Sequence, residues 1–146
     1  MESFVGAWRL ASWERRSASG EVSYLYGRKP AGQLIYTSNG RMSAQLMHPD
    51  AAPSDSAGSG SNEAAAEVAK RFFAYWGTYA VDESRAVVTH HVLGGLARSW
   101  VGRDHVRRYE FLNDDRLQLA ADLENDDVAD RAGFAGVQVL VWERIP

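Results

Sequence analysis

Cysteine is absent from this chain of 146 residues, which excludes disulfide bridges, thiol nucleophiles and metal sites ligated by cysteine. An excess of positive charge is absent too: the net charge is −3 and no basic run occurs, so nucleic acid is not an expected partner. No apolar run is long enough to cross a bilayer as a helix, so we expect no membrane partner. The N-terminal MESFVGAWRL lacks the basic and apolar regions of a signal peptide, and we expect a cytoplasmic protein.

Several motifs of known active sites are also missing. The chain has no P-loop, no dinucleotide-binding fingerprint and no G-x-S-x-G elbow. The carboxylate-rich residues 122–136 lack the spacing of an EF-hand, so we interpret them as a solvated acidic loop. Haem held by a single histidine has no support in the sequence. We therefore expect neither a cofactor nor a metal.

What the chain does have is a series of short β-type runs separated by turn residues. Its hydrophobic content of 45% suits one globular domain spanning residues 1–146. About nine strands are predicted, joined mostly by short turns, which indicates an antiparallel barrel or sandwich. The predicted strands are residues 5–15, 21–26, 33–38, 41–47, 79–82, 86–93, 105–112, 116–121 and 137–144.

One helix is predicted between the fourth and fifth strands. Asn62 is a suitable N-cap and Gly77 a natural stop. The apolar residues between them recur at helical spacing, so the helix should pack on the barrel or cap its mouth. The apolar stripe comprises Ala65, Val68, Ala69, Phe72, Phe73 and Trp76. The preceding residues 49–61 are rich in Ala, Ser and Gly and are predicted to form a loop.

Asn39-Gly40 is the strongest hairpin signal in the chain, because a two-residue type I′ turn needs positive φ at both positions. This register places Tyr36 and Gln45 on one face and Met42 and Ala44 on the other. The face of Met42 is more apolar and is the expected interior. Tyr36 and Gln45 then point outward, unless a polar ligand occupies the lumen.

Two doublets of polar residues interrupt strands that are otherwise apolar. These are His90-His91 and Arg107-Arg108. Because side chains alternate along a strand, one member of each doublet should face inward and the other outward. The two histidines therefore cannot readily share a metal ion. The pattern does not decide which member faces in.

A hairpin turning at Asp114-Asp115 leaves two arrangements of the seventh predicted strand open. In one, Arg108 and Glu110 face the interior, where an ion pair would be costly to desolvate. In the other, Tyr109 and Phe111 face the interior and the charges face water. The residue pattern favours neither arrangement over the other.

The motif GAWRL, which contains Trp8, resembles the Gly-x-Trp signature of lipocalins. In that signature the tryptophan closes the base of the barrel and a C-terminal arginine, here Arg144, packs across it. The chain as a whole resembles the lipocalin-like domain family of short cytosolic bacterial and fungal proteins. The segments that carry this resemblance are GAWRLASWE, GQLIYTSNGRMSAQLM, YWGTYAVDE, VTHHVLGG, WVGRDHVRRYEF and VLVWERI.

The resemblance implies an all-β fold with one helix: an antiparallel lipocalin-like barrel whose lumen binds a hydrophobic small molecule. Family members encoded beside natural-product pathways suggest a cofactor-independent cyclase, isomerase or dehydratase acting on a polyketide-like intermediate. The alternative is a carrier that sequesters such a molecule without catalysis. A barrel with a filled interior is a third possibility. Exposed strand edges and several tryptophans also allow a homodimer.

Within this framework, histidine is the natural proton donor or acceptor near neutral pH, and arginine or tyrosine can stabilise an enolate. The candidate catalytic residues are His90, His91, Arg108 and Glu110. The candidate ligand-binding residues are Tyr36, Met42, Ala44, Gln45, Trp100, Arg107 and Tyr109.

Overall fold

The fold is known from a computed structural model that describes residues 2–51, 62–122 and 136–146. Residues 123–135 of the predicted acidic loop, and residues 52–61 of the predicted loop 49–61, lie outside these residues. The strands are β1 (Gly6–Ser17), β2 (Val22–Ser23), β3 (Ala31–Tyr36), β4 (Arg41–Met47), β5 (Phe72–Asp82), β6 (Val87–Gly95), β7 (Asp104–Asn113), β8 (Arg116–Asp122) and β9 (Gly136–Arg144). The helices are α1 (Asn62–Lys70) and the 3₁₀ turns η1 (Glu2–Phe4), η2 (Pro49–Ala51) and η4 (Arg98–Trp100).

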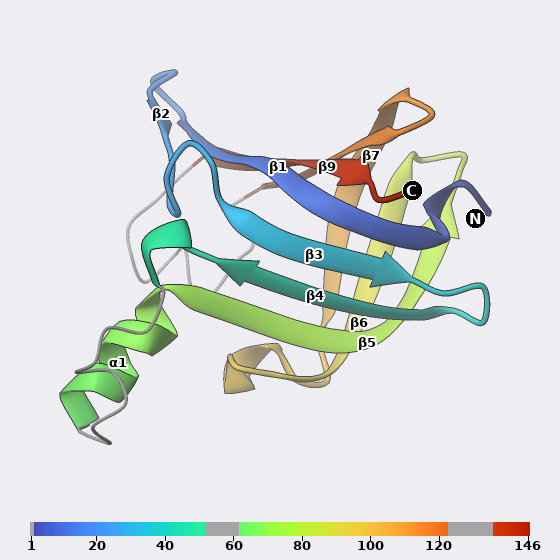
Figure 1. The fold of residues 1–146 in the computed structure, drawn as a ribbon. Coiled ribbons are helices and arrows are strands. Elements are labelled where there is room, and N and C mark those ends of the chain that lie inside the picture. Colours follow the sequence, from blue (N-terminus) through green and yellow to red (C-terminus); the bar gives the residue numbers. More distant parts are fainter. Residues whose placement is uncertain (1, 52–61, 123–135) are drawn as a thin grey trace.

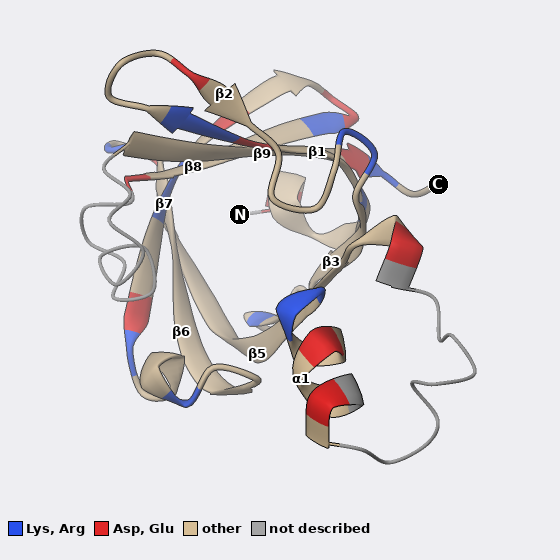
Figure 2. Ribbon diagram, turned by 90° about the vertical axis from the view of Figure 1, so that its left-hand side faces the viewer, with Lys and Arg blue, Asp and Glu red and all other residues tan. Residues whose placement is uncertain are grey.

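The strands form an antiparallel barrel, as predicted. β1 pairs with β3, and each strand from β3 to β8 pairs with the next one along the chain. β9 then pairs with β1, so that eight strands close the barrel, and β2 adds a short edge beside β1 (Figure 1). Figure 2 looks into this ring of strands, with the N-terminal segment inside it and α1 outside. Because the sheet is closed, alternate residues of each strand point into a shared interior. No helix in the described ranges is long and apolar enough to cross a membrane.

The predicted helix forms between β4 and β5 and begins at Asn62, but it is shorter than predicted. It ends at Lys70, and Phe72 already begins β5, so the predicted apolar stripe does not form. The described side chains of α1 are all exposed, and α1 projects from the start of β5 without covering the barrel (Figure 1). The aromatic run after Lys70 fits a strand equally well, because Tyr75 and Tyr79 alternate inward while Trp76 points out. These residues form a strand and not a helix because Phe72–Thr78 pair with β4.

The first hairpin has a different register from the predicted one. Tyr36 pairs with Met42 across the five residues 37–41, in which the Thr37 hydroxyl accepts a hydrogen bond from the backbone N–H of Arg41 at 3.0 Å. Tyr36 therefore shares the inner face with Met42 and is 1% exposed. The prediction that Tyr36 points outward was wrong, because the local turn signal does not include the energy gained by burying a tyrosine.

The second hairpin decides between the two arrangements left open above. Tyr109 pairs with Leu119 and Phe111 with Leu117, and both aromatic rings pack inside against Phe4. Arg108 and Glu110 consequently face outward. The Arg108 guanidinium binds the Asp122 carboxylate at 2.9 Å, where both side chains are more than half exposed.

One end of the barrel is closed by the lipocalin-type signature. Trp8 is fully buried, and its indole N–H donates to the carbonyl of Phe4 at 2.9 Å. The Arg144 guanidinium lies 4.2 Å from the centre of the Trp8 ring, as the resemblance implied. The same guanidinium donates to the backbone oxygens of Ser3 and Val5, so it ties the N-terminal turn to the last strand. These contacts leave the opposite half of the interior available for a cavity.

Candidate functional site

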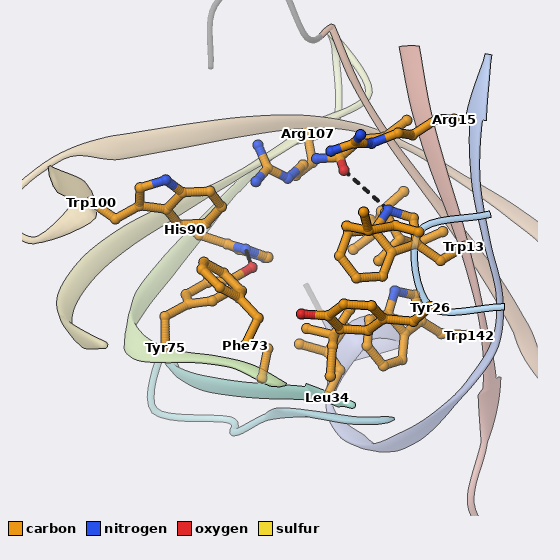
Figure 3. A pocket seen from close by; sticks show the side chains of 16 residues that line it. Trp13, Arg15, Tyr26, Leu34, Phe73, Tyr75, His90, Trp100, Arg107 and Trp142 are labelled. Atoms are coloured by element: carbon orange, nitrogen blue, oxygen red, sulfur yellow. Dashed lines mark hydrogen bonds between the residues drawn. The ribbon is translucent and has the colours of Figure 1, made fainter. Parts of the chain in front are cut away.

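A cavity of about 190 Å³ lies in the half of the barrel away from Trp8 and is partly open to solvent (Figure 3). An apolar cavity of about 150 Å³ holds benzene, so this one suits a molecule of one or two rings. Most of its wall is apolar or aromatic, which favours a hydrophobic occupant. The lining residues are Trp13, Arg15, Leu25, Tyr26, Leu34, Ala44, Leu46, Phe73, Tyr75, His90, Trp100, Arg107, Leu119, Gln138, Leu140 and Trp142.

His90 is the central polar group of this wall. It is the inward member of its doublet, is 1% exposed, and lies on β6 facing strands β3 and β5. Its Nε2 is 2.6 Å from the Tyr36 hydroxyl and its Nδ1 is 2.8 Å from the Tyr75 hydroxyl. A neutral imidazole accepts at one nitrogen and donates from the other, so both hydrogen bonds can form at once. The three side chains therefore make one continuous buried chain of hydrogen bonds.

Burial determines the charge states of these three hydrogen-bonded side chains. It lowers the pKa of His90 well below its ordinary value of 6.5, and the nearby Arg107 charge lowers it further. Burial also raises the pKa of Tyr36 well above 10 and raises that of Tyr75, although the Arg107 guanidinium opposes the effect at Tyr75. At neutral pH the histidine is therefore uncharged and both tyrosines keep their protons.

Arg107 is the inward member of the second doublet and brings a charge into the cavity wall. It is only 8% exposed, and its guanidinium lies 5.7 Å from the centre of the Trp100 ring. Trp100 in turn stacks on His105, with ring centres 3.8 Å apart. The guanidinium donates to the Val106 backbone oxygen at 3.3 Å, and it interacts with Tyr75. No ion pair joins Arg107 to a carboxylate in the part of the chain that the structure describes.

The structure brings only part of the predicted site together. His90, Ala44, Trp100 and Arg107 line the cavity, and Tyr36 binds His90. Met42 and Tyr109 point inward but do not line it; the Tyr109 ring packs on Phe4 at the closed end. The residues that line the cavity, together with Tyr36, are the ones that remain candidates for a ligand site.

Four predicted site residues lie on the outer face of the barrel and do not line the cavity. His91 points outward and binds the Asp104 carboxylate at 2.5 Å, as strand alternation requires once His90 faces in. Arg108 and Glu110 are outward for the same reason, because Arg107 and Tyr109 face in. Gln45 donates to the Ser43 hydroxyl on the outer face of β4, opposite the buried side chains of Met42 and Ala44, as the hairpin pattern itself predicted.

Sequence reasoning missed most of the cavity wall. Tyr75 and Phe73 were assigned to the helix, although their period of two with Tyr79 is a strand signal. Trp13 and Gln138 lie on the paired strands β1 and β9, and the Trp13 indole donates to the Gln138 amide oxygen at 3.1 Å. No spacing in the sequence indicates that these strands meet. Such residues become visible only when the barrel closes.

Two indole N–H groups in the cavity wall have no hydrogen-bond partner in the described structure. They belong to Trp100 and Trp142, which are 7% and 2% exposed. A ligand oxygen could satisfy a buried donor of this kind. No group of three His, Asp or Glu side chains that could hold a metal ion occurs in the ranges described above.

Comparison with known proteins places this architecture in a family. A family model described as a lipocalin-like domain matches residues 5–145. Similar solved structures include a redesigned β-barrel (TM-score 0.48, 10% identity, covering 99% of this chain and 94% of that one). A de novo designed fluorescence-activating β-barrel is also similar (TM-score 0.43, 10% identity, covering 99% and 95%). No curated protein matches the chain. The chain belongs to the lipocalin-like domain family.

Proposed function

We propose that the barrel binds a small, mostly apolar ketone-like molecule and catalyses its isomerisation or cyclisation by moving a proton through Tyr75 and His90. The observation that carries the proposal is the buried Tyr36–His90–Tyr75 chain, two members of which line the cavity. A wall that only had to exclude water would need no imidazole between two hydroxyl groups. A polyketide-like intermediate of one or two rings fits both the size and the apolar walls of the cavity.

The proton transfer can be written with the groups present. The Tyr75 oxygen takes a proton from the carbon beside the ligand's carbonyl and passes its own proton to Nδ1 of neutral His90. The electron pair of the broken C–H bond moves to the carbonyl oxygen and forms an enolate. Arg15 and Arg107 are the charged side chains among the described lining residues, and both favour this negative charge. Return of the proton to another carbon gives an isomer. Attack of the enolate carbon on a second carbonyl closes a ring, and the alkoxide so formed takes the proton back from His90 through Tyr75.

Deuterium exchange tests this step without knowledge of the natural substrate. The protein should accelerate exchange of the α-protons of 2-tetralone with D₂O, followed by proton NMR. General acid–base groups typically contribute about 10²–10⁴-fold, so His90→Ala and Tyr75→Phe should each lose at least about tenfold. His91→Ala is the matched control and should exchange like the parent, because His91 lies outside the barrel.

The pH dependence adds a second criterion. Because the pKa of His90 lies well below 6.5, the enzyme-dependent rate should stay constant from pH 8 down to 6.5 and fall only at lower pH. Equal rates for His90→Ala and the parent would exclude histidine from the mechanism. Binding of 2-tetralone without any acceleration would contradict the enzyme and favour the alternative, a non-catalytic carrier.

A further inference from the structure

We infer that the ligand carries a carboxylate and that Arg107 binds it, so that the natural ligand is a small aromatic or alicyclic acid. This inference rests on the proposed function, because it assigns a ligand class to the same cavity. It identifies Arg107 as the residue that determines specificity, in addition to the proton-transfer role given to Tyr75 and His90.

The first argument is the contrast between Arg107 and the exposed arginines. Arg9, Arg16 and Arg108 each hold a carboxylate within 3.1 Å at the surface. Arg107 is the buried one, and no described carboxylate pairs with it. A charge taken out of water without a counter-ion is strongly unfavourable, so its retention requires an explanation. An anionic ligand supplies the partner that the described residues do not.

The second argument is that Arg107 ties the fold together less than Arg144 does, because its side-chain contacts are with Trp100 and Tyr75 of the cavity wall. Its hydrogen bond at 3.3 Å goes to the backbone of Val106, its own neighbour in the chain. Arg144 shows what a structural arginine does in this protein, because its guanidinium joins Ser3, Val5 and the ring of Trp8. Arg107 instead lines the cavity and keeps donors available there. A guanidinium has five N–H donors and matches the geometry of a carboxylate.

The third argument is the arrangement of the rest of the wall. Figure 3 shows Arg15 and Arg107 on the same side of the cavity, and across from them lie Leu34 and the rings of Tyr26 and Trp142. The wall is thus cationic on one side and apolar on the other. A compact acid has the same asymmetry, with a charged group at one end and a hydrophobic ring at the other. Size limits the ring system to one or two rings.

Matched ligands test the inference by isothermal titration calorimetry at pH 7. 2-Naphthoate and 2-naphthamide have the same ring and nearly the same shape, but only the first is an anion. The parent protein should bind the acid at least tenfold more tightly than the amide, since hydrogen bonds to charged groups are the stronger class. Arg107→Met should lose this preference, and Arg107→Lys should keep part of it. Arg108→Met is the control, because it removes the same charge one residue away on the outer face.

The outcomes separate this inference from the proposed function. Equal affinity of the parent for the acid and the amide would overturn the role of Arg107 while leaving the cavity as a ligand site. An undiminished preference in Arg107→Met would overturn it as well. If the parent binds neither compound and no 2-tetralone, the ligand site itself is refuted. Arg107→Met should fold normally by circular dichroism, because it removes a buried charge that no described carboxylate pairs with. The comparison of the two ligands on the parent needs no variant.

Discussion

Trp8→Ala is expected to destabilise the protein by about 3–5 kcal/mol, the usual range for truncating a buried aromatic residue. Trp8 is fully buried, donates a hydrogen bond to Phe4 and supports the Arg144 guanidinium at 4.2 Å. Its removal leaves a cavity and takes away the aromatic face on which that charge lies. The free energy of unfolding of a domain of this size is roughly 5–15 kcal/mol, so Trp8→Ala should remove a large part of it. Urea unfolding followed by circular dichroism measures the change.

Trp76→Ala provides the matched control for this prediction. It makes the same chemical change on β5, but Trp76 is 52% exposed on the outer face. We expect a loss of about 1 kcal/mol or less, as is usual for surface substitutions. Similar losses for Trp8→Ala and Trp76→Ala would contradict the assignment of Trp8 as the closure of the barrel.

Gly77→Ala is expected to cost about 3 kcal/mol, at the upper end of the range for overpacked sites. A Cβ at this position would lie 1.9 Å from the backbone oxygen of His91, so the two strands would have to move apart. The glycine stands where the pairing of β5 with β6 shifts register, between Trp76 and Gly77. Close backbone approach, and not the predicted end of a helix, is the reason for a glycine here.

Gly102→Ala separates steric clash from backbone strain. Gly102 has a φ of +80°, but a Cβ there would meet nothing within 4 Å. Only the cost of the left-handed conformation remains, about 1 kcal/mol. In urea unfolding the parent should be the most stable, Gly102→Ala less stable, and Gly77→Ala the least stable of the three. If Gly77→Ala is as stable as the parent, the close approach to His91 is wrong.

Much of the fold could be predicted because it depends on local patterns. Nine β-type runs, turn residues between them and the Gly-x-Trp motif were sufficient for an antiparallel barrel closed by Trp8 and Arg144. Alternation along a strand also predicted that each doublet would be divided between the two faces. His90 and Arg107 face inward, while His91 and Arg108 face outward. These predictions need only the geometry of a single strand.

The remaining features depend on contacts between distant segments. Phe73 and Tyr75 fit a helix stripe as well as a strand, and only the pairing of β5 with β4 distinguishes the two. Tyr36 turned inward because its burial outweighed the preference of the Asn39-Gly40 dipeptide for a two-residue turn. The cavity wall could not be predicted, since its residues come from strands that meet only after closure. Trp13 and Gln138, which are hydrogen-bonded, are the clearest example.

The two halves of the interior have different roles in this account. The half around Trp8, Phe4 and Phe111 is filled by aromatic rings and stabilises the barrel. The half around His90 and Arg107 is left partly open and holds the proposed ligand site. Substitutions in the first half should therefore change stability, whereas substitutions in the second should change binding.

The five tryptophans allow this division to be measured directly. Three line the cavity, namely Trp13, Trp100 and Trp142, while Trp8 is buried at the closed end and Trp76 lies on the outer face. Indole N–H signals in a ¹⁵N–¹H correlation spectrum report each one separately. Saturation with 2-naphthoate should shift the signals of the three cavity tryptophans and leave those of Trp8 and Trp76 in place. A shift confined to Trp76, or uniform shifts of all five signals, would contradict a ligand site inside the barrel.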